Sequence, residues 1–260
     1  MCIVAIAWQL LDDLPLCLLS NRDEFYARPT QQLGFWHNSP VIAGQDLTSG
    51  GTWMGVTLTG RWAVITNFRD GHERAHYSTS RGHLVQKFLE STLTPIRFAQ
   101  QLEKVQCDYA GFNLVLGDQQ QAVYMSNRGE APQILAPGVY VLSNTLMSQY
   151  WQKTQHLRHR FTQEFLPMLQ YADTNLIDLQ RLAWDLLQDQ RQVVPDLLPD
   201  TGIDAAMEAL LSSTFIQSAD YGTRCSNLIK MTSSSWQWSE KSQQGLTQSD
   251  IVQLYGKIIS

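Results

Sequence analysis

Short apolar runs separated by compact turns dominate the first third of the chain, and this pattern predicts strands. The runs cover residues 2–8, 16–20, 52–58 and 62–67. Thr59-Gly60 separates the last two runs, and glycine in such a turn adopts the positive φ that tight hairpins require. We therefore expect neighbouring strands of this region to pair in antiparallel fashion.

Further along the chain, helical and extended patterns alternate. Two helices are predicted over 81–89 and 96–105, with Ser80 and Thr94 as their N-caps. Helical spacing returns over residues 149–211. Extended patterns occupy residues 111–117, 122–126, 139–143, 227–232 and 235–238. Because these elements do not form regular βαβ units, we predict an α+β fold with helices packed outside antiparallel sheets.

Composition narrows the class of protein. The chain has 260 residues, of which 43% are hydrophobic, and its net charge of −5 gives no basic face for nucleic acid. No repeat, low-complexity tract or Pro/Gly/Ser-rich linker divides it, so a single domain over residues 1–260 is predicted. No apolar stretch approaches 18 residues, so we expect no transmembrane segment and a cytoplasmic location.

The four cysteines lie far apart without a metal-binding spacing, so we predict reduced thiols and no metal site. Cys2 stands out because it directly follows the initiator methionine, whose removal is normally permitted before a small residue. The mature chain would then begin with a thiol beside its own α-amine, whose pKa of about 7.7–8 lets it accept the thiol proton. The alternative is that Cys2 is a small hydrophobe in an apolar strand.

A polar cluster, Asn21-Arg22-Asp23-Glu24, follows the second predicted strand. A solvated surface turn would explain it. If the first two strands pair as a hairpin, however, the cluster lies near Cys2. A carboxylate there can orient an α-ammonium, and an arginine can lower a thiol pKa. The cluster is therefore either a surface turn or part of a catalytic site.

Other polar residues stand where strands or helices begin or end. Asn67 closes an apolar strand, where its NH₂ group can face a developing oxyanion, and Asn144 closes another strand in the same way. Ser80 and Arg81 at a predicted helix start either bind a carboxylate or phosphate or form an ordinary cap. Trp53 near the presumed cleft indicates an apolar or aromatic ligand, or else core packing.

Several segments together resemble the motif set of the NRDE family, the transport and Golgi organisation protein family, which is named after its Asn-Arg-Asp-Glu motif. Besides that cluster, the matching segments are Met1-Cys2-Ile3-Val4, Gly50-Gly51-Thr52-Trp53-Met54-Gly55, Thr66-Asn67-Phe68-Arg69, Ser80-Arg81-Gly82 and Tyr221-Gly222-Thr223-Arg224. The family is similar in turn to the N-terminal-nucleophile cysteine hydrolases, which include penicillin V acylase, bile salt hydrolase and acid ceramidase. This resemblance implies a four-layer αββα sandwich.

The resemblance also implies roles for single residues. In those acylases the second strand carries Arg-Asn-x-Asp, so Asp23 inherits the role of orienting the α-amine. The acylase arginine falls on Ser20, and this chain instead has Arg22 two positions later. Asn144 and Asn67 resemble the two oxyanion donors, and Arg224 stands for a late active-site arginine.

The leading hypothesis is an N-terminal cysteine amidohydrolase or acylase that cleaves a small amide or thioester and requires no cofactor. Cys2 would attack the carbonyl, and Arg22, Asp23, Asn67 and Asn144 would assist. The first rival is a non-catalytic protein that binds or traffics haem or an acyl lipid in the same cleft, as work on eukaryotic relatives implies. The chain has no Cys-Pro or CxxCH haem motif. The second rival is a stability-only protein with a vestigial cleft.

Overall fold

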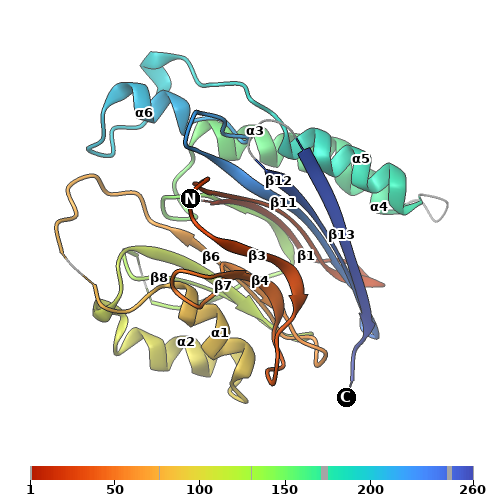
Figure 1. Cartoon of the computed structure of the whole chain (residues 1–260). Helices are drawn as coiled ribbons and strands as arrows, with labels where there is room; N and C mark the ends of the chain where they lie inside the picture. The colour runs from red at the N-terminus through yellow and green to blue at the C-terminus, as the bar shows by residue number, and fades with distance from the viewer. Residues whose placement is uncertain (1, 76, 130, 171–174, 245–247, 260) are drawn as a thin grey trace.

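Two antiparallel sheets lie face to face, and helices cover both outer faces (Figure 1). The structure is a computed structural model that describes residues 2–75, 77–129, 131–170, 175–244 and 248–259. Across the first sheet the strands are β10 (Gly138–Leu142), β1 (Cys2–Leu11), β2 (Leu14–Phe25), β11 (Tyr221–Met231), β12 (Ser235–Gln244) and β13 (Gln248–Lys257). Across the second they are β3 (Thr30–Phe35), β4 (Ile42–Asp46), β5 (Met54–Val56), β6 (Trp62–Asn67), β7 (Phe112–Gly117), β8 (Ala122–Ser126) and β9 (Gln133–Ile134).

Two groups of helices form the outer layers (Figure 1). On the six-stranded sheet lie α3 (Gln152–Arg160), the π-helical turn η2 (Phe161–Phe165), α4 (Leu166–Gln170) and α5 (Leu176–Leu187). On the seven-stranded sheet lie α1 (Gly82–Glu90) and α2 (Pro95–Glu103), while connections hold η1 (Gln106–Asp108), η3 (Pro195–Leu197) and α6 (Ala205–Leu210). No helix in the described part of the chain has the length and apolar character needed to span a membrane. The predicted αββα sandwich is confirmed.

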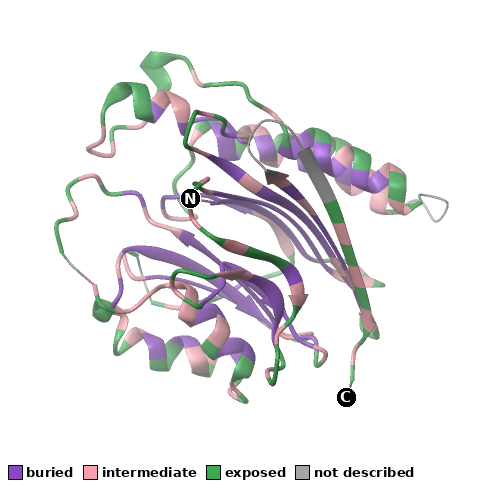
Figure 2. Ribbon diagram, viewed as in Figure 1, coloured by how far each residue is buried: buried purple, intermediate pink, exposed green. Residues whose placement is uncertain are grey.

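Strand β1 is apolar on both faces because each face is covered. Val4, Ile6 and Trp8 belong to the core between the sheets, whereas Ile3 and Ala5 pack beneath the helices of the outer layer. Side chains alternate between faces along a strand, so a central strand buried on both sides becomes a continuous apolar run. Figure 2 shows the same burial along the middle strands of both sheets.

Strand β2 is longer than predicted. The sequence pattern ended it at Ser20, whereas it continues through the Asn-Arg-Asp-Glu cluster to Phe25. The predicted strand end and the surface-turn alternative for this cluster are therefore wrong, because β11 pairs with β2 from Leu16 to Phe25 and supplies ladder partners to the polar segment. The polar side chains are therefore held by the sheet.

Helix α1 begins one position later than predicted. Arg81, not Ser80, occupies the N-cap position, and no side chain caps the helix there. The cap predicted for Ser80 is therefore wrong, although its Oγ accepts a hydrogen bond from the Gly82 amide at 3.3 Å. Ser80 and Arg81 both line a pocket at this end of the molecule.

Candidate active site

Cys2 opens β1 directly opposite Arg22 of β2, and Arg22 lies opposite Cys225 of β11. Paired residues of antiparallel strands point to the same face, so these three side chains share the face that looks toward the other sheet. The predicted hairpin between the first two strands is confirmed. It makes Arg22 the immediate cross-strand neighbour of the Cys2 thiol.

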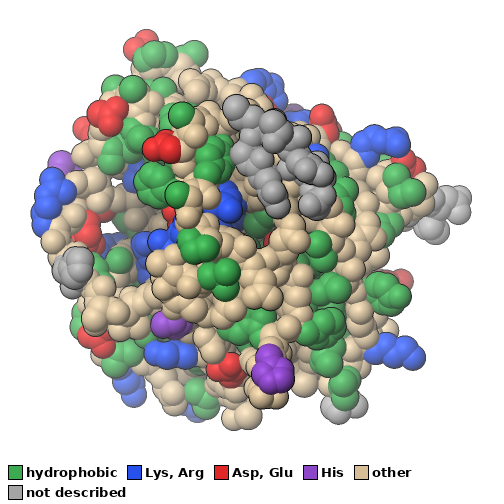
Figure 3. Space-filling view, in the orientation of Figure 1, with side chains coloured by type: hydrophobic (Ala, Val, Ile, Leu, Met, Phe, Trp, Pro, Cys, Tyr) green, Lys and Arg blue, Asp and Glu red, His purple; other side chains and the backbone are tan. Residues whose placement is uncertain are grey.

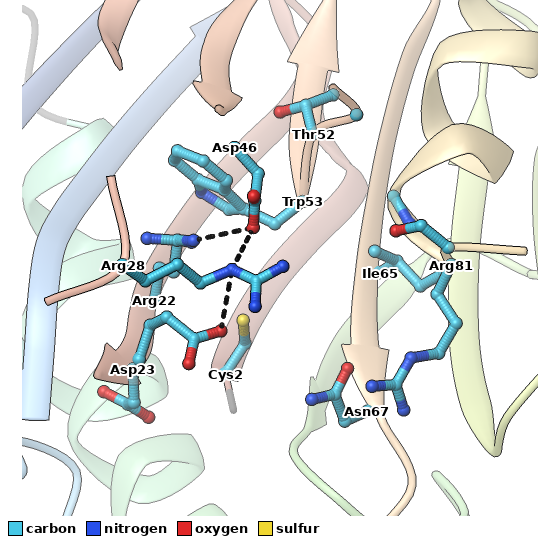
Figure 4. A pocket seen from close by; sticks show the side chains of 14 residues that line it. Cys2, Arg22, Asp23, Arg28, Asp46, Thr52, Trp53, Ile65, Asn67 and Arg81 are labelled. Atoms are coloured by element: carbon cyan, nitrogen blue, oxygen red, sulfur yellow. Dashed lines mark hydrogen bonds and ion pairs between the residues drawn. The ribbon is translucent and has the colours of Figure 1, made fainter. Parts of the chain in front are cut away.

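A pocket of about 150 Å³ lies at this end of the sandwich. Residues from β1, β2, β4, β6, the segment before β5 and the start of α1 form its walls, as Figure 4 shows. On the face of the molecule in Figure 3 the surface is hollowed between loops, and Lys and Arg side chains are visible in the hollow. The lining residues are Cys2, Arg22, Asp23, Glu24, Arg28, Asp46, Gly51, Thr52, Trp53, Ile65, Asn67, Ser80, Arg81 and Gly82.

Three residues on the side of the seven-stranded sheet fix Arg22: one in β3, one at the end of β4 and one in the segment before β5. Its Nη1 donates to Thr30 Oγ1 at 3.0 Å, its Nη2 donates to Asp46 Oδ2 at 3.3 Å, and its Cζ lies 4.2 Å from the centroid of the Trp53 ring. Arg28 Nε also donates to Asp46 Oδ2, at 2.6 Å. Burial raises the pKa of Asp46, but the hydrogen bonds from Arg28 and the Ser49 amide and the charges of both arginines together outweigh burial, so the pKa is lowered. Asp46 is therefore an ionised anchor for both arginines.

Asp23 is buried and accepts a hydrogen bond from Thr223 Oγ1 at 2.7 Å. Burial raises the pKa of this carboxyl group, whereas the hydroxyl of Thr223 and the charges of Lys153 and Arg22 act in the opposite direction. Asp23 lines the pocket together with Cys2. Asp23 and Cys2 therefore share the pocket, and the role of Asp23 in orienting the α-amine stays a prediction.

The Cys2 thiol is almost withdrawn from solvent, with 6% of the residue exposed. Burial raises its pKa, the charge of Asp23 raises it further, and the charge of Arg22 lowers it. A raised pKa keeps the thiol protonated near neutral pH. Nucleophilic chemistry at Cys2 therefore needs a base that removes the thiol proton.

The two asparagines predicted for an oxyanion hole lie together but differ in their exposure to the pocket. Asn67 lines the pocket, whereas Asn144 does not, and Asn144 Nδ2 donates to the backbone oxygen of Asn67 at 2.9 Å. The Ser143 hydroxyl oxygen lies 3.0 Å from both the Cys2 carbonyl oxygen and Asn144 Oδ1. Asn144 therefore supports the backbone that presents Asn67, and a direct oxyanion contact by Asn144 stays a prediction.

The three predicted ligand-binding residues, Ser80, Arg81 and Trp53, all line the pocket. Trp53 carries the Arg22 guanidinium on its ring. By contrast, the predicted catalytic residue Arg224 does not line the pocket. Its Nη1 donates to three backbone oxygens of the turn after β2, those of Phe25, Tyr26 and Arg28, at 2.7, 3.1 and 3.0 Å. In this structure Arg224 holds the turn.

Three residues around Arg22 were not singled out from the sequence: Thr30 and Asp46, which accept hydrogen bonds from it, and Arg28, which binds Asp46. Arg28 follows the Asn-Arg-Asp-Glu cluster by only four positions, but a single charged residue before a proline carries no signal of its own. Asp46 ends β4, a strand whose sequence Ile-Ala-Gly-Gln-Asp has weak strand character. The partner of the pocket arginine was thus hidden in a strand that the pattern did not predict.

The fold is that of the N-terminal-nucleophile hydrolases. Among solved structures, a conjugated bile acid hydrolase from Clostridium perfringens matches with a TM-score of 0.50 and 9% sequence identity, over 97% of this chain and 92% of that chain. At this identity the likeness concerns the fold alone. It agrees with the layers and antiparallel sheets described above.

Sequence comparison defines the family. The sequence profile of Transport and Golgi organisation 2 matches residues 1–243. A Transport and Golgi organization protein 2 homolog from Bos taurus is 33% identical over 231 residues, and a homolog from Mus musculus is 30% identical over 227 residues. Each alignment covers 82% of this chain and 81% of the relative. The chain belongs to the Transport and Golgi organisation 2 family, the family that its motifs predicted.

Proposed function

We propose that the chain, after removal of Met1, is an N-terminal cysteine amidohydrolase that acts on a small amide or thioester. The observation that carries this proposal is the position of Cys2 in a pocket that Asp23, Asn67 and Arg81 also line. These residues supply a nucleophile, a carboxylate and hydrogen-bond donors, which are the parts that acyl transfer requires. The solved structure with a similar fold is named a hydrolase, which supports the same reaction class.

The α-amine of Cys2 would act as the base that the buried thiol needs. It accepts the thiol proton, and the thiolate forms a C–S bond with the carbonyl carbon of the substrate. Asn67 then donates a hydrogen bond to the oxyanion. When the C–N or C–S bond of the substrate breaks, the leaving amine or thiol takes the proton from the α-ammonium, and the acyl group stays on Cys2.

Water completes the reaction by the same route. The α-amine accepts a proton from water as the water oxygen attacks the acyl carbon. The C–S bond to Cys2 then breaks, and the sulfur takes the proton back as the carboxylic acid leaves. Asp23 positions the α-ammonium in both halves of the reaction, and Arg22 stabilises the neighbouring thiolate.

The position of the arginine fits this mechanism although it differs from that of the acylases. Residues 20 and 22 are two positions apart on β2, so their side chains lie on the same face of the sheet. Arg22 extends from that face toward Trp53 and Asp46 and stays beside Cys2 in the ladder. The shift of two positions therefore keeps a guanidinium next to the nucleophile.

The size and charge of the pocket favour a small polar substrate over the haem or acyl-lipid alternative. Pockets for drug-sized ligands measure about 300–1,000 Å³, whereas this one measures about 150 Å³ and is lined by three arginines and three carboxylates. No contact among the described residues favours the alternative. Haem binding, which a titration followed by visible absorbance would reveal, stays a prediction, as does the cytoplasmic location.

The decisive experiment asks whether Cys2 becomes acylated. Purified protein is incubated with thioesters of N-acetylcysteamine bearing small acyl groups, quenched in acid and digested for peptide mass spectrometry. We expect one acyl group on the peptide that begins with Cys2 and none in the Cys2→Ala variant. Cys107→Ser, which removes an exposed thiol, is the matched control and should be acylated normally. Equal acylation of chains that retain Met1 would contradict the role of the α-amine, and acylation confined to Cys107 would contradict the nucleophile.

A further inference from the structure

Arg81 is the arginine of the pocket that has no carboxylate partner within the described residues. The ion pairs in the pocket join Arg22 and Arg28 to Asp46, and Arg28 to Glu24. Arg81 Nη1 instead donates to the Gly111 carbonyl oxygen at 2.8 Å. A guanidinium carries five N–H donors, so Arg81 has donors left for a ligand.

The backbone beneath Arg81 is held by close packing. A Cβ atom on Gly51 would lie 2.6 Å from the carbonyl carbon of Gly82, and the Thr52 amide donates to the Gly82 oxygen at 3.2 Å. The chain before β5 therefore packs against the start of α1 without room for a side chain between them. With the Gly111 contact at the far end of the side chain, both ends of Arg81 are fixed before any ligand arrives.

The guanidinium of Arg81 faces the nucleophile across the pocket. In Figure 4 it lies beside the Asn67 side chain, and both are directed toward the side of the pocket that holds the Cys2 thiol. Burial lowers the pKa of Arg81, while the charge of a Cys2 thiolate raises it. Glu24 also acts on Arg81 through its charge, but no carboxylate of the described residues forms an ion pair with Arg81. A partly buried cation without such a pair gains more from binding an anion than an exposed cation does.

We infer that Arg81 binds a carboxylate of the substrate, so that the enzyme acts on small acyl compounds that carry a carboxylate besides the reacting carbonyl. The planar fork of a guanidinium matches a carboxylate in a bidentate geometry. The pocket volume of about 150 Å³ suits an acyl chain of a few carbons. That the bound anion is a substrate rests on the proposed function, whereas anion binding at Arg81 does not depend on it.

Two alkylating agents test the anion site without any hydrolysis. Iodoacetate and iodoacetamide both form a C–S bond with a thiolate as the C–I bond breaks and iodide leaves. Iodoacetate carries a carboxylate, whereas iodoacetamide carries a neutral amide in its place. The ratio of their rates at Cys2 cancels the thiolate fraction. We expect the iodoacetate to iodoacetamide ratio at Cys2 to be about tenfold higher in the folded protein than in the urea-unfolded chain, because a charge-assisted hydrogen bond favours the anion.

Arg81→Met should lower this ratio by about tenfold, and Arg81→Lys should restore part of it because the charge remains. Arg74→Gln removes an exposed arginine outside the pocket and should leave the ratio unchanged. The exposed thiol of Cys107 in the same molecules is the internal standard for reagent strength. Circular dichroism establishes that each variant is folded. A ratio in folded Arg81→Met within twofold of the wild-type ratio would overturn the inference, as would a wild-type ratio equal to that of the unfolded chain.

A matched pair of thioesters extends the test to substrates. The succinyl and butyryl thioesters of N-acetylcysteamine have the same four-carbon acyl chain, but only the former carries a carboxylate. We expect succinylation of Cys2 to be about tenfold faster than butyrylation, after spontaneous hydrolysis is subtracted, and Arg81→Met to remove this preference. Equal acylation by both, with a flat alkylation ratio, would reject the carboxylate site and leave the hydrolase standing. No acylation by either, with the expected alkylation ratio, would reject the hydrolase and leave the anion site standing.

Discussion

Two buried arginines of this protein, Arg22 in the pocket and Arg69 just after β6, are held in similar ways. Arg22 lies on the Trp53 ring and pairs with Asp46. Arg69 lies with its Cζ 4.7 Å from the centroid of Trp151 and pairs with Glu208 of α6 at 2.6 Å. Each arginine thus has one carboxylate and one tryptophan.

We call these groups the pocket set (Arg22, Asp46 and Trp53) and the Arg69 set (Arg69, Glu208 and Trp151), each together with a second cation near its carboxylate. The two sets differ in this second cation. Next to Asp46 it is Arg28, whose side chain is 31% exposed and whose pKa is raised, chiefly by its hydrogen bond to Asp46. Next to Arg69 it is Lys153, which is 5% exposed and whose pKa burial lowers to about 7. The difference arises because Arg28 donates directly to its carboxylate, whereas Lys153 is buried and donates to the Leu211 carbonyl oxygen. Arg28 and Asp46 therefore stay charged at neutral pH because their pKa values are raised and lowered respectively, whereas Lys153 titrates near neutrality.

The largest expected effect breaks the buried pair. Arg69→Met leaves Glu208 buried without its cation and should lower the free energy of unfolding by about 3–5 kcal/mol. Arg22→Met should cost less, about 1–2 kcal/mol, because Asp46 keeps Arg28 at 2.6 Å. Urea denaturation at pH 7 measures both. An equal loss of free energy of unfolding in Arg69→Met and Arg22→Met would contradict the proposed difference between the two arginines. Arg69→Met combined with Glu208→Met should lose less than Arg69→Met alone.

The next prediction concerns Asp23, whose charge interacts with cations of both sets, Arg22 and Lys153. Asp23→Asn should slow acylation of Cys2 by about 10²-fold, because the α-amine loses the carboxylate that positions it. Removing this negative charge also makes the α-ammonium more acidic, so the rise of acylation rate with pH should move to lower pH. A rate against pH profile for both proteins measures the two effects. A slower variant with an unshifted profile would indicate a structural role only.

Much of the site could be predicted because its core lies on two neighbouring strands. The short connection between the apolar runs at residues 2–8 and 16–20 indicated the hairpin, and the hairpin places Cys2 beside Arg22. The six-stranded sheet could not be completed in this way. β13 is an edge strand whose residues 251–257 alternate between exposed and half-buried. Its apolar residues fall on both faces, with Ile251 and Tyr255 exposed, so they form no one-sided strand pattern.

The parts that could not be predicted depend on distant contacts. β3 and β4 are short and polar, and they become strands because they pair with each other and β4 pairs with β5. Lys153 lies in the polar sequence Gln-Lys-Thr-Gln, which is typical of an exposed helix face. Its amine is instead buried and donates to the Leu211 carbonyl oxygen at 2.8 Å, 58 residues later. Local sequence carries no signal for such burial.

A smaller effect follows from the titration of Lys153. Its pKa of about 7 in the folded protein lies below its ordinary value of 10.5. Between these pH values the unfolded chain binds one more proton than the folded protein. The free energy of unfolding therefore rises with pH above 7, and below pH 7 the destabilisation caused by burying the charged amine is at its full value. Wild-type stability relative to Lys153→Met should therefore rise between pH 7 and 9 by up to about 1.4 kcal/mol per pH unit. Loss of the Leu211 hydrogen bond shifts the whole difference without changing its slope. Parallel curves in urea denaturation would show that Lys153 does not titrate in this range.

The smallest effect separates the two sets by function. Thr30 Oγ1 accepts a hydrogen bond from Arg22, and the Thr201 hydroxyl donates to Glu208, the partner of Arg69. Thr30→Val and Thr201→Val each remove one such hydrogen bond at constant shape, so each should lower the free energy of unfolding by about 1 kcal/mol. Only Thr30→Val acts on an arginine beside Cys2, so it alone should slow acylation, by about threefold to fivefold, which corresponds to the same energy. Equal acylation rates in the two variants would mean that the hold on Arg22 serves stability and not the nucleophile.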